Sequence, residues 1–156
     1  MHTWNSPAGP LTLGRHPYDQ DEPALFAWNG ADILLVRHAL EAGSQLRVLV
    51  LNDSFGALAC ALRLAGYEVR WQSDSFIAGS ACRRNLADNG LDPGEVVFLD
   101  SLTWPDVSDW APDLVLMQLP KSKLMLEFQL GFLAASLPAG TPVCAGGMTR
   151  DIHDST

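Results

Sequence analysis

The chain has few cysteines and no long apolar run, and each shortage excludes a class of protein. Cys60, Cys82 and Cys144 are odd in number and form no C-x-x-C pair, which argues against a disulfide framework and favours buried, reduced thiols. No apolar stretch approaches the roughly 18 residues of a membrane span. Residues 1–15 lack the cationic start and apolar core of a signal peptide. These features predict a soluble, cytoplasmic protein with no membrane partner.

Positive charge is also scarce. Ten Lys and Arg residues face 18 Asp and Glu residues, so the formal net charge is −8 at pH 7. Phosphate affinity comes from Lys and Arg that neutralise the nucleic-acid backbone, so any RNA contact would have to be local. The four histidines show no ligand spacing with one another or with the cysteines, and no metal site is predicted.

The composition that remains is that of one globular domain. The 156 residues are 47% hydrophobic and 18% charged, which argues against disorder. A chain of this length buries roughly 70% of its unfolded surface in one core. Residues 1–23 are predicted to form a hairpin-like or irregular N-terminal arm, and residues 24–156 the domain itself.

Strand and helix signals alternate along the domain. Apolar runs predict strands over residues 46–51, 67–71, 95–99, 113–119 and 141–145. Helical spacing predicts helices over residues 24–42, 57–62, 76–89 and 123–137. This alternation is typical of a doubly wound, mainly parallel α/β sheet of Rossmann type. A fifth strand normally leads into another helix and closing strands, so we expect a fragment of a longer protein, truncated after that strand.

Residues 46–62 combine a buried strand, a turn and a small-residue helix, which is the unit that opens a nucleotide-binding α/β fold. Ligands of open parallel sheets bind outside the carboxyl ends of the strands, so Asp53, Asp74 and Asp100 are expected to line one crevice. Acids at three successive strand ends are the arrangement of a class I S-adenosylmethionine-binding domain. One acid would bond the ribose hydroxyls and another the adenine amine.

The same turn lacks the glycines that let a cofactor loop approach its ligand. If Asp53 is the loop acid, none of the expected glycine positions holds glycine. If Gly56 is the last glycine, the earlier positions hold Asn52 and Ser54, and Val50 replaces the acid of the strand. The second register is preferred because it keeps the helix start in place. In either register the cofactor pocket is predicted to be degenerate.

The end of the fourth strand departs from an amine-methylating site in the same way. Such enzymes place an Asn or Asp, two prolines and an aromatic there, to hold the target amine and stack on the base. The corresponding residues are Gln118, Leu119, Pro120 and Lys121. Only the second proline is present and no stacking ring is offered, so Gln118 occupies a vestigial amine-site position.

Several segments carry a family resemblance in combination: residues 49–61, 83–90, 98–101 and 119–121, and residues 145–146 with 150–153. Together they resemble the N-terminal half of the large-subunit ribosomal RNA guanine-N2 methyltransferase G family. The small-subunit guanine-N2 methyltransferase C family is a more distant relative. The resemblance runs over nearly the whole chain.

The resemblance implies two tandem methyltransferase-like domains, of which the C-terminal one binds S-adenosylmethionine and carries a catalytic Asn-Pro-Pro-Phe motif. That motif is absent from this sequence, so no catalytic residue is predicted. The chain itself is expected to bind no cofactor, and Asp53, Gly56, Asp74 and Asp100 would be vestiges of a cofactor site. Its expected partners are the catalytic C-terminal domain and large-subunit ribosomal RNA.

Three hypotheses follow. The preferred one is a scaffolding domain that docks the catalytic domain and helps to hold RNA through Arg83, Arg84, Lys121 and Lys123. The second is a self-sufficient S-adenosylmethionine-dependent methyltransferase, with acids at the strand ends, Asp74 and Asp100, on the cofactor and Gln118 at the amine. The third is an unrelated Rossmann-type domain that binds a dinucleotide or only a partner protein, although no G-x-G-x-x-G motif supports dinucleotide binding.

Overall fold

The structure, a computed structural model, describes residues 1–17, 25–100 and 110–147. Residues 150–153, which carry part of the family resemblance, lie outside the described residues. The elements follow in the order β1 (His2–Ser6), β2 (Gly9–Leu13), α1 (Gly30–Ala42), β3 (Arg47–Leu51), α2 (Ala57–Leu64), β4 (Glu68–Gln72), α3 (Phe76–Asp88), a 3-10 turn (Pro93–Glu95), β5 (Val97–Leu99), β6 (Leu114–Gln118), α4 (Lys123–Ser136) and β7 (Val143–Gly146).

The central sheet has the strand order β5-β4-β3-β6-β7, and all four neighbouring pairs are parallel. In register, Val50 of β3 lies opposite Trp71 of β4 and Leu116 of β6. The chain therefore winds outward from β3 to β5, then returns to the other side of β3 at β6. This topology confirms the doubly wound prediction, and it places the switch in winding direction between β3 and β6.

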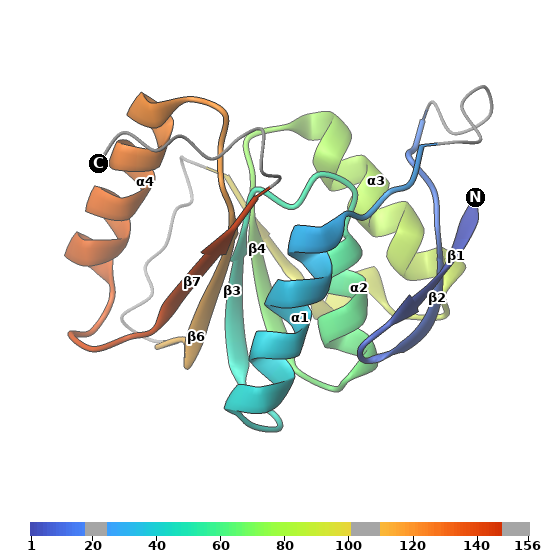
Figure 1. Ribbon diagram of the computed structural model, residues 1–156, viewed down its shortest axis with the longest axis horizontal. Helices are drawn as coiled ribbons and strands as arrows, with labels where there is room; N and C mark the ends of the chain where they lie inside the picture. Colours follow the sequence, from blue (N-terminus) through green and yellow to red (C-terminus); the bar gives the residue numbers. More distant parts are fainter. Residues whose placement is uncertain (18–24, 101–109, 148–156) are drawn as a thin grey trace.

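Helices cover both faces of the sheet (Figure 1). Helices α1, α2 and α3 lie on one face, and α4 lies on the other. Val48 and Val50 of β3 pack toward the three-helix side, whereas Leu49 and Leu51 pack with Leu133 of α4. All four strand side chains are fully buried. The continuous apolar run arises because successive side chains point to opposite faces and both faces are covered.

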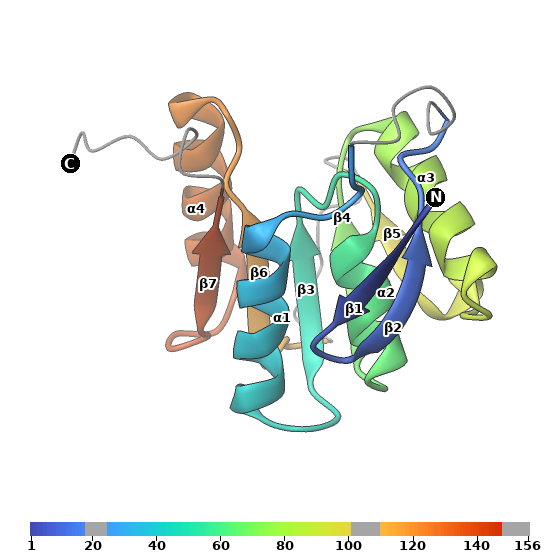
Figure 2. The same ribbon diagram turned by 45° about the vertical axis from the view of Figure 1, so that its right-hand side comes forward.

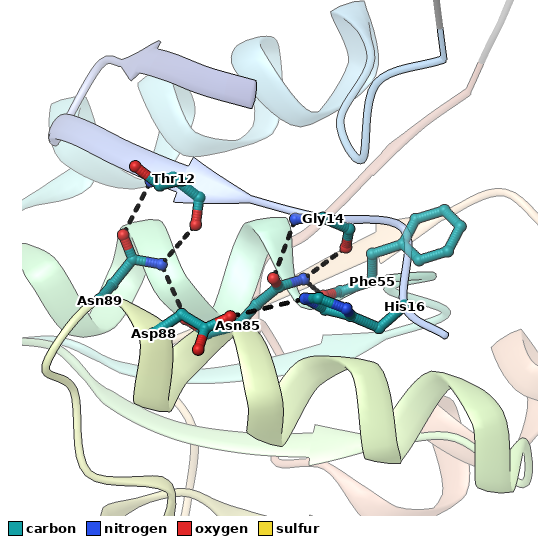
Figure 3. A network of polar contacts seen from close by, with 7 residues as sticks. All are labelled: Thr12, Gly14, His16, Phe55, Asn85, Asp88 and Asn89. Atoms are coloured by element: carbon teal, nitrogen blue, oxygen red, sulfur yellow. Dashed lines mark hydrogen bonds and ion pairs between the residues drawn. The ribbon is translucent and has the colours of Figure 1, made fainter. Parts of the chain in front are cut away.

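The N-terminal arm is a β1–β2 hairpin that packs over α2 and α3 (Figure 2). Trp4, Leu11 and Leu13 are buried in the same core cluster as those helices. Asn85 of α3 and Asn89 at its C-terminal cap bind the backbone of β2 and of the residue that follows it (Figure 3). The Asn89 amide donates to the Thr12 carbonyl and accepts from its N–H at 2.8 Å, and Asn85 pairs with Gly14 at 2.9 and 3.0 Å.

The prediction of a helix over residues 24–42 is wrong at its start, because α1 begins at Gly30. Asn29 has an extended backbone, its side chain accepts from the Asp32 N–H, and the Asp32 carboxylate accepts from the Asn29 N–H. This capping box fixes the first turn. The other predicted helices and strands agree with the structure to within about two residues at most ends. Cys60 and Cys82 are buried, but Cys144 is only half-buried.

Candidate functional site

Two cavities open at the carboxyl edge of the sheet, on either side of the turn that follows β3. The β3–β6 pocket, of about 600 Å³, is lined by residues 25–29, 52–55 and 118–121 together with Arg15, Asp32 and Gly147. The β4–β5 pocket, of about 320 Å³, is lined by residues 73–76 and 98–100 together with Trp71, Gly79 and Arg83. The larger pocket lies at the switch point of the sheet, where ligands of such folds bind.

Asn52 occupies one of the two missing-glycine positions and has the backbone conformation that glycine usually supplies, with φ of 66°. Asparagine tolerates this left-handed region better than most residues. Its side-chain amide donates to the Gln118 carbonyl at 2.9 Å and pairs reciprocally with the Gln129 amide at 2.8 and 2.9 Å. Asn52 therefore ties the turn to β6 and α4.

Asp53 points into the protein, with 2% of the residue exposed. Its carboxylate accepts hydrogen bonds from the Leu58 and Ala59 N–H groups at 3.4 and 3.1 Å, and from the Trp71 indole at 3.1 Å. Gly56, at the start of α2, has no side chain to cap the helix, so Asp53 does so. Burial raises the pKa of Asp53, and these hydrogen bonds oppose the rise.

Gly56 is required by helix packing. Its φ is 90°, and a Cβ added there would lie 2.7 Å from the Cys82 Cα and 2.8 Å from its Sγ. Helices α2 and α3 approach each other so closely at this point that only glycine fits. The preferred register of the turn places α2 directly after Gly56, and α2 begins at Ala57.

The sequence reasoning missed Asp32, which lies near the start of α1 and lines the β3–β6 pocket. Its carboxylate accepts hydrogen bonds from the Asn29 N–H and from the Gln118 side-chain amide. Burial, and then the negative charge of Asp53, raise the pKa of Asp32 to about 7. The Asn-x-x-Asp spacing of a capping box was the local signal for this residue.

The expectation of one crevice for three acids is wrong for Asp53. Asp74 and Asp100 line the β4–β5 pocket, whereas Asp53 borders the β3–β6 pocket. The Trp71 ring lies between them, because it lines the smaller pocket and donates its N–H to Asp53. The acid at the end of β3 is thereby held in the interior, away from the acids of β4 and β5.

Three of the four predicted cations lie at the same edge of the sheet. Lys121 lines the β3–β6 pocket, and Lys123 is exposed at the first turn of α4. The Arg83 guanidinium lies 3.9 Å from the centre of the Phe98 ring in the β4–β5 pocket. Arg84 is exposed and lines neither pocket.

Arg15 was not predicted, yet it lines the β3–β6 pocket with its guanidinium 4.8 Å from the Phe55 ring centre. The pocket therefore offers cations, aromatic rings and hydrogen-bond acceptors. Burial raises the pKa of the Cys60 and Cys82 thiols, so neither is a thiolate nucleophile at neutral pH.

Among the described residues, no three His, Cys, Asp or Glu side chains are grouped to hold a metal ion. In the same part of the chain, no helix has the length and apolar character to cross a bilayer.

The family model described as "RLMG N-terminal domain" matches residues 1–156. Ribosomal RNA large subunit methyltransferase G from Erwinia tasmaniensis is 43% identical over 146 residues, covering 94% of this chain and 38% of the relative. The same protein from Cronobacter sakazakii is 46% identical over 149 residues, covering 94% and 37%. The chain thus spans under two fifths of these relatives, and the resemblance read from the sequence is confirmed.

Solved structures show the same fold at low identity. Ribosomal protein L11 methylase from Lactobacillus delbrueckii subsp. bulgaricus superposes with a TM-score of 0.56 at 20% identity, over 75% of this chain and 58% of that one. A SAM-dependent methyltransferase from Thiobacillus denitrificans, in complex with S-adenosyl-L-homocysteine, gives a TM-score of 0.54 at 18% identity, over 80% and 52%. The chain has the class I methyltransferase fold.

Proposed function

Because the chain belongs to the family of RLMG N-terminal domains, we propose that it is the non-catalytic N-terminal domain of an S-adenosylmethionine-dependent ribosomal RNA guanine-N2 methyltransferase. In this role it docks a catalytic C-terminal domain and helps to bind large-subunit ribosomal RNA in the cytoplasm. S-adenosylmethionine is then the cofactor of the C-terminal domain.

The turn after β3 is the observation that carries the proposal. A cofactor loop places backbone N–H groups and an acid where they meet the ligand. Here Asn52 and Ser54 stand in place of glycines, and Asp53 accepts hydrogen bonds from Leu58, Ala59 and Trp71 in the interior of the protein. Gln118, at the position of an amine-binding residue, donates its side-chain amide to Asp32. These groups are engaged in holding the fold, which supports a domain without its own cofactor.

RNA binding is supported by where the exposed cations lie. Lys121 and Lys123 lie at the start of α4, and Arg83 lines the β4–β5 pocket at the same sheet edge, with Arg84 next to it on α3. Against a net charge of −8, only such a local group can provide phosphate contacts.

Calorimetric titration of this chain with S-adenosylmethionine tests the cofactor part. The titration is expected to show no saturable heat. A dissociation constant in the micromolar range would overturn the proposal and favour the alternative of a self-sufficient methyltransferase domain.

The RNA part is tested in the full-length protein with Lys121→Glu and Lys123→Glu combined. Losing two phosphate contacts is expected to weaken binding of large-subunit RNA by roughly tenfold or more at low salt. Arg37→Glu combined with Arg47→Glu is the matched control, because both residues are exposed and line neither pocket. Equal RNA affinity of the two double variants would remove the support for this surface.

A further inference from the structure

The β3–β6 pocket keeps the properties of a ligand site although the cofactor turn beside it does not. Its volume of about 600 Å³ is in the usual range for small-molecule sites, and it lies at the switch point of the sheet. Buried residues form its inner part, since Asp32 is only 4% exposed, whereas Lys121 and Ser54 are exposed at its rim. The pocket therefore has a polar interior and a solvent-facing entrance.

The inner part of the pocket favours a ligand with N–H donors. One Asp32 carboxylate oxygen accepts a hydrogen bond from the Asn29 N–H, and the other accepts one from the Gln118 side-chain amide. A carboxylate oxygen can accept a second one. The half-buried Gln118 amide also lines the pocket. Together these groups match the hydrogen-bonding edge of a nucleobase.

An aromatic wall lies beside these acceptors. Phe26 is 52% exposed and packs against Trp28, with ring centres 4.9 Å apart. Trp28 in turn stacks on the buried Trp4 ring at 5.7 Å and 16°. An exposed ring held by a rigid stack is a platform on which a base can lie, as in proteins that bind unpaired nucleotides.

Two cations complete the pocket. Arg15 lines it from the segment after β2, and Lys121 lines it from the segment after β6. A half-buried guanidinium and an exposed ammonium suit a phosphate or a ribose-phosphate backbone. A nucleobase inside and a phosphate at the entrance require the mixed surface that this pocket presents.

We propose that the β3–β6 pocket binds one unpaired nucleotide, with the base against Asp32 and Gln118 and the phosphate near Arg15 and Lys121. The inference rests on the proposed function, because the nucleotide is supplied by the RNA that the domain helps to hold. Guanine is favoured over uracil, since its edge offers adjacent N–H donors to a carboxylate, whereas uracil places a single N–H between two carbonyls.

The test begins with NMR titration of this chain with GMP and UMP. GMP is expected to shift resonances of the pocket residues saturably and to bind at least about fivefold tighter than UMP. At pH 8, above the pKa of about 7 of the Asp32 carboxyl, Asp32→Asn is expected to weaken GMP binding about tenfold and to reduce the preference over UMP, because a charged acceptor is lost. Glu41→Gln, at the far end of α1, removes one acidic charge outside the pocket and is expected to leave GMP affinity unchanged.

Lys121→Ala supplies a variant at an exposed position that does not threaten folding, and GMP affinity is expected to fall about threefold to tenfold. Absence of saturable GMP binding, or equal binding by wild type, Asp32→Asn and Lys121→Ala, would overturn the inference. S-adenosylmethionine that displaces GMP from the pocket would also overturn it, because the site would then be a cofactor site.

A short single-stranded RNA separates the two sources of a nucleotide. If RNA supplies it, an octamer containing guanosine binds at least about tenfold tighter than GMP, and Asp32→Asn weakens both ligands. GMP binding without any RNA affinity would overturn the RNA source. RNA affinity that depends on Lys123 but not on Asp32, without GMP binding, would leave the proposed function standing and reject the pocket.

Discussion

The two pockets at the carboxyl edge differ in what their acids do. In the β3–β6 pocket, Asp32 and Asp53 are almost fully buried and accept hydrogen bonds from the protein's own N–H groups. In the β4–β5 pocket, Asp74 and Asp100 are exposed. The first pair is held inside because N–H groups at the starts of α1 and α2, and the Trp71 indole, donate hydrogen bonds to it. A carboxylate at a strand end therefore has no fixed role, since its burial decides whether it holds the fold or faces a ligand.

The turn that separates the two pockets ends at Gly56, where α2 and α3 are in close contact. Gly56→Ala is expected to lower the free energy of unfolding by about 4 kcal/mol, because it combines a strained φ with a Cβ 2.7 Å from the Cys82 backbone. Urea denaturation measures the change. Gly66→Ala is the matched control, because Gly66 has φ of 85° but nothing within 4 Å of an added Cβ. It should cost about 1 kcal/mol, and equal losses would contradict the packing argument.

Removing each kind of acid compares the pockets directly. Asp53→Ala leaves the Leu58 and Ala59 N–H groups and the Trp71 indole without their acceptor, so it is expected to cost about 3 kcal/mol of stability. Asp74→Ala, at an exposed position of the other pocket, is expected to cost under about 0.5 kcal/mol. Thermal and urea unfolding report both values. Similar costs for the two variants would show that burial does not separate the two pockets.

The pH dependence of stability sharpens the comparison through Asp32. Its pKa is 3.8 in the unfolded chain and about 7 in the folded protein. Between these values the folded state holds a proton that the unfolded state has released, so the free energy of unfolding falls as the pH rises. From pH 5 to pH 7 this contribution amounts to about 2 kcal/mol.

Asp32→Asn should remove that loss, and the difference between variant and wild-type unfolding curves at several pH values measures it. Glu41→Gln on the same helix is exposed and should leave the slope as it is in the wild type. If Asp32→Asn left the pH dependence of the free energy of unfolding unchanged, that dependence would come from another group.

The sheet and its winding were predictable because their signals are local. The run that contains β3 is apolar at successive positions, and Gly43 and Gly56 mark where elements end or begin. Patterns of this kind report burial and turns within a few residues. They also explain why most element ends agree with the structure.

The site was less predictable because its contacts join distant segments. Asp53 is hydrogen-bonded to Trp71, 18 positions away in the sequence, and Asp32 is hydrogen-bonded to Gln118, 86 positions away. The periodicity of apolar residues in the sequence does not indicate such long-range pairs. The predicted start of α1 was wrong for another reason. Leu25, Phe26 and Trp28 have helical spacing, but they precede the helix and line the β3–β6 pocket. The capping box at Asn29 was the better signal.

The smallest expected effect concerns the β4–β5 pocket, where Arg83 lies over the Phe98 ring at 3.9 Å from its centre. Arg83→Ala is expected to lower the free energy of unfolding by about 0.5–1 kcal/mol, because an exposed cation–π contact contributes that much. Arg84→Ala removes the same charge from the next position of α3, which lines neither pocket, and should change stability by less than about 0.3 kcal/mol. The two variants are compared by urea unfolding at high and low salt. Because the cation–π contact is local, the difference in unfolding free energy between the two variants should persist at high salt. A difference that disappears at high salt would show that it comes from general surface charge.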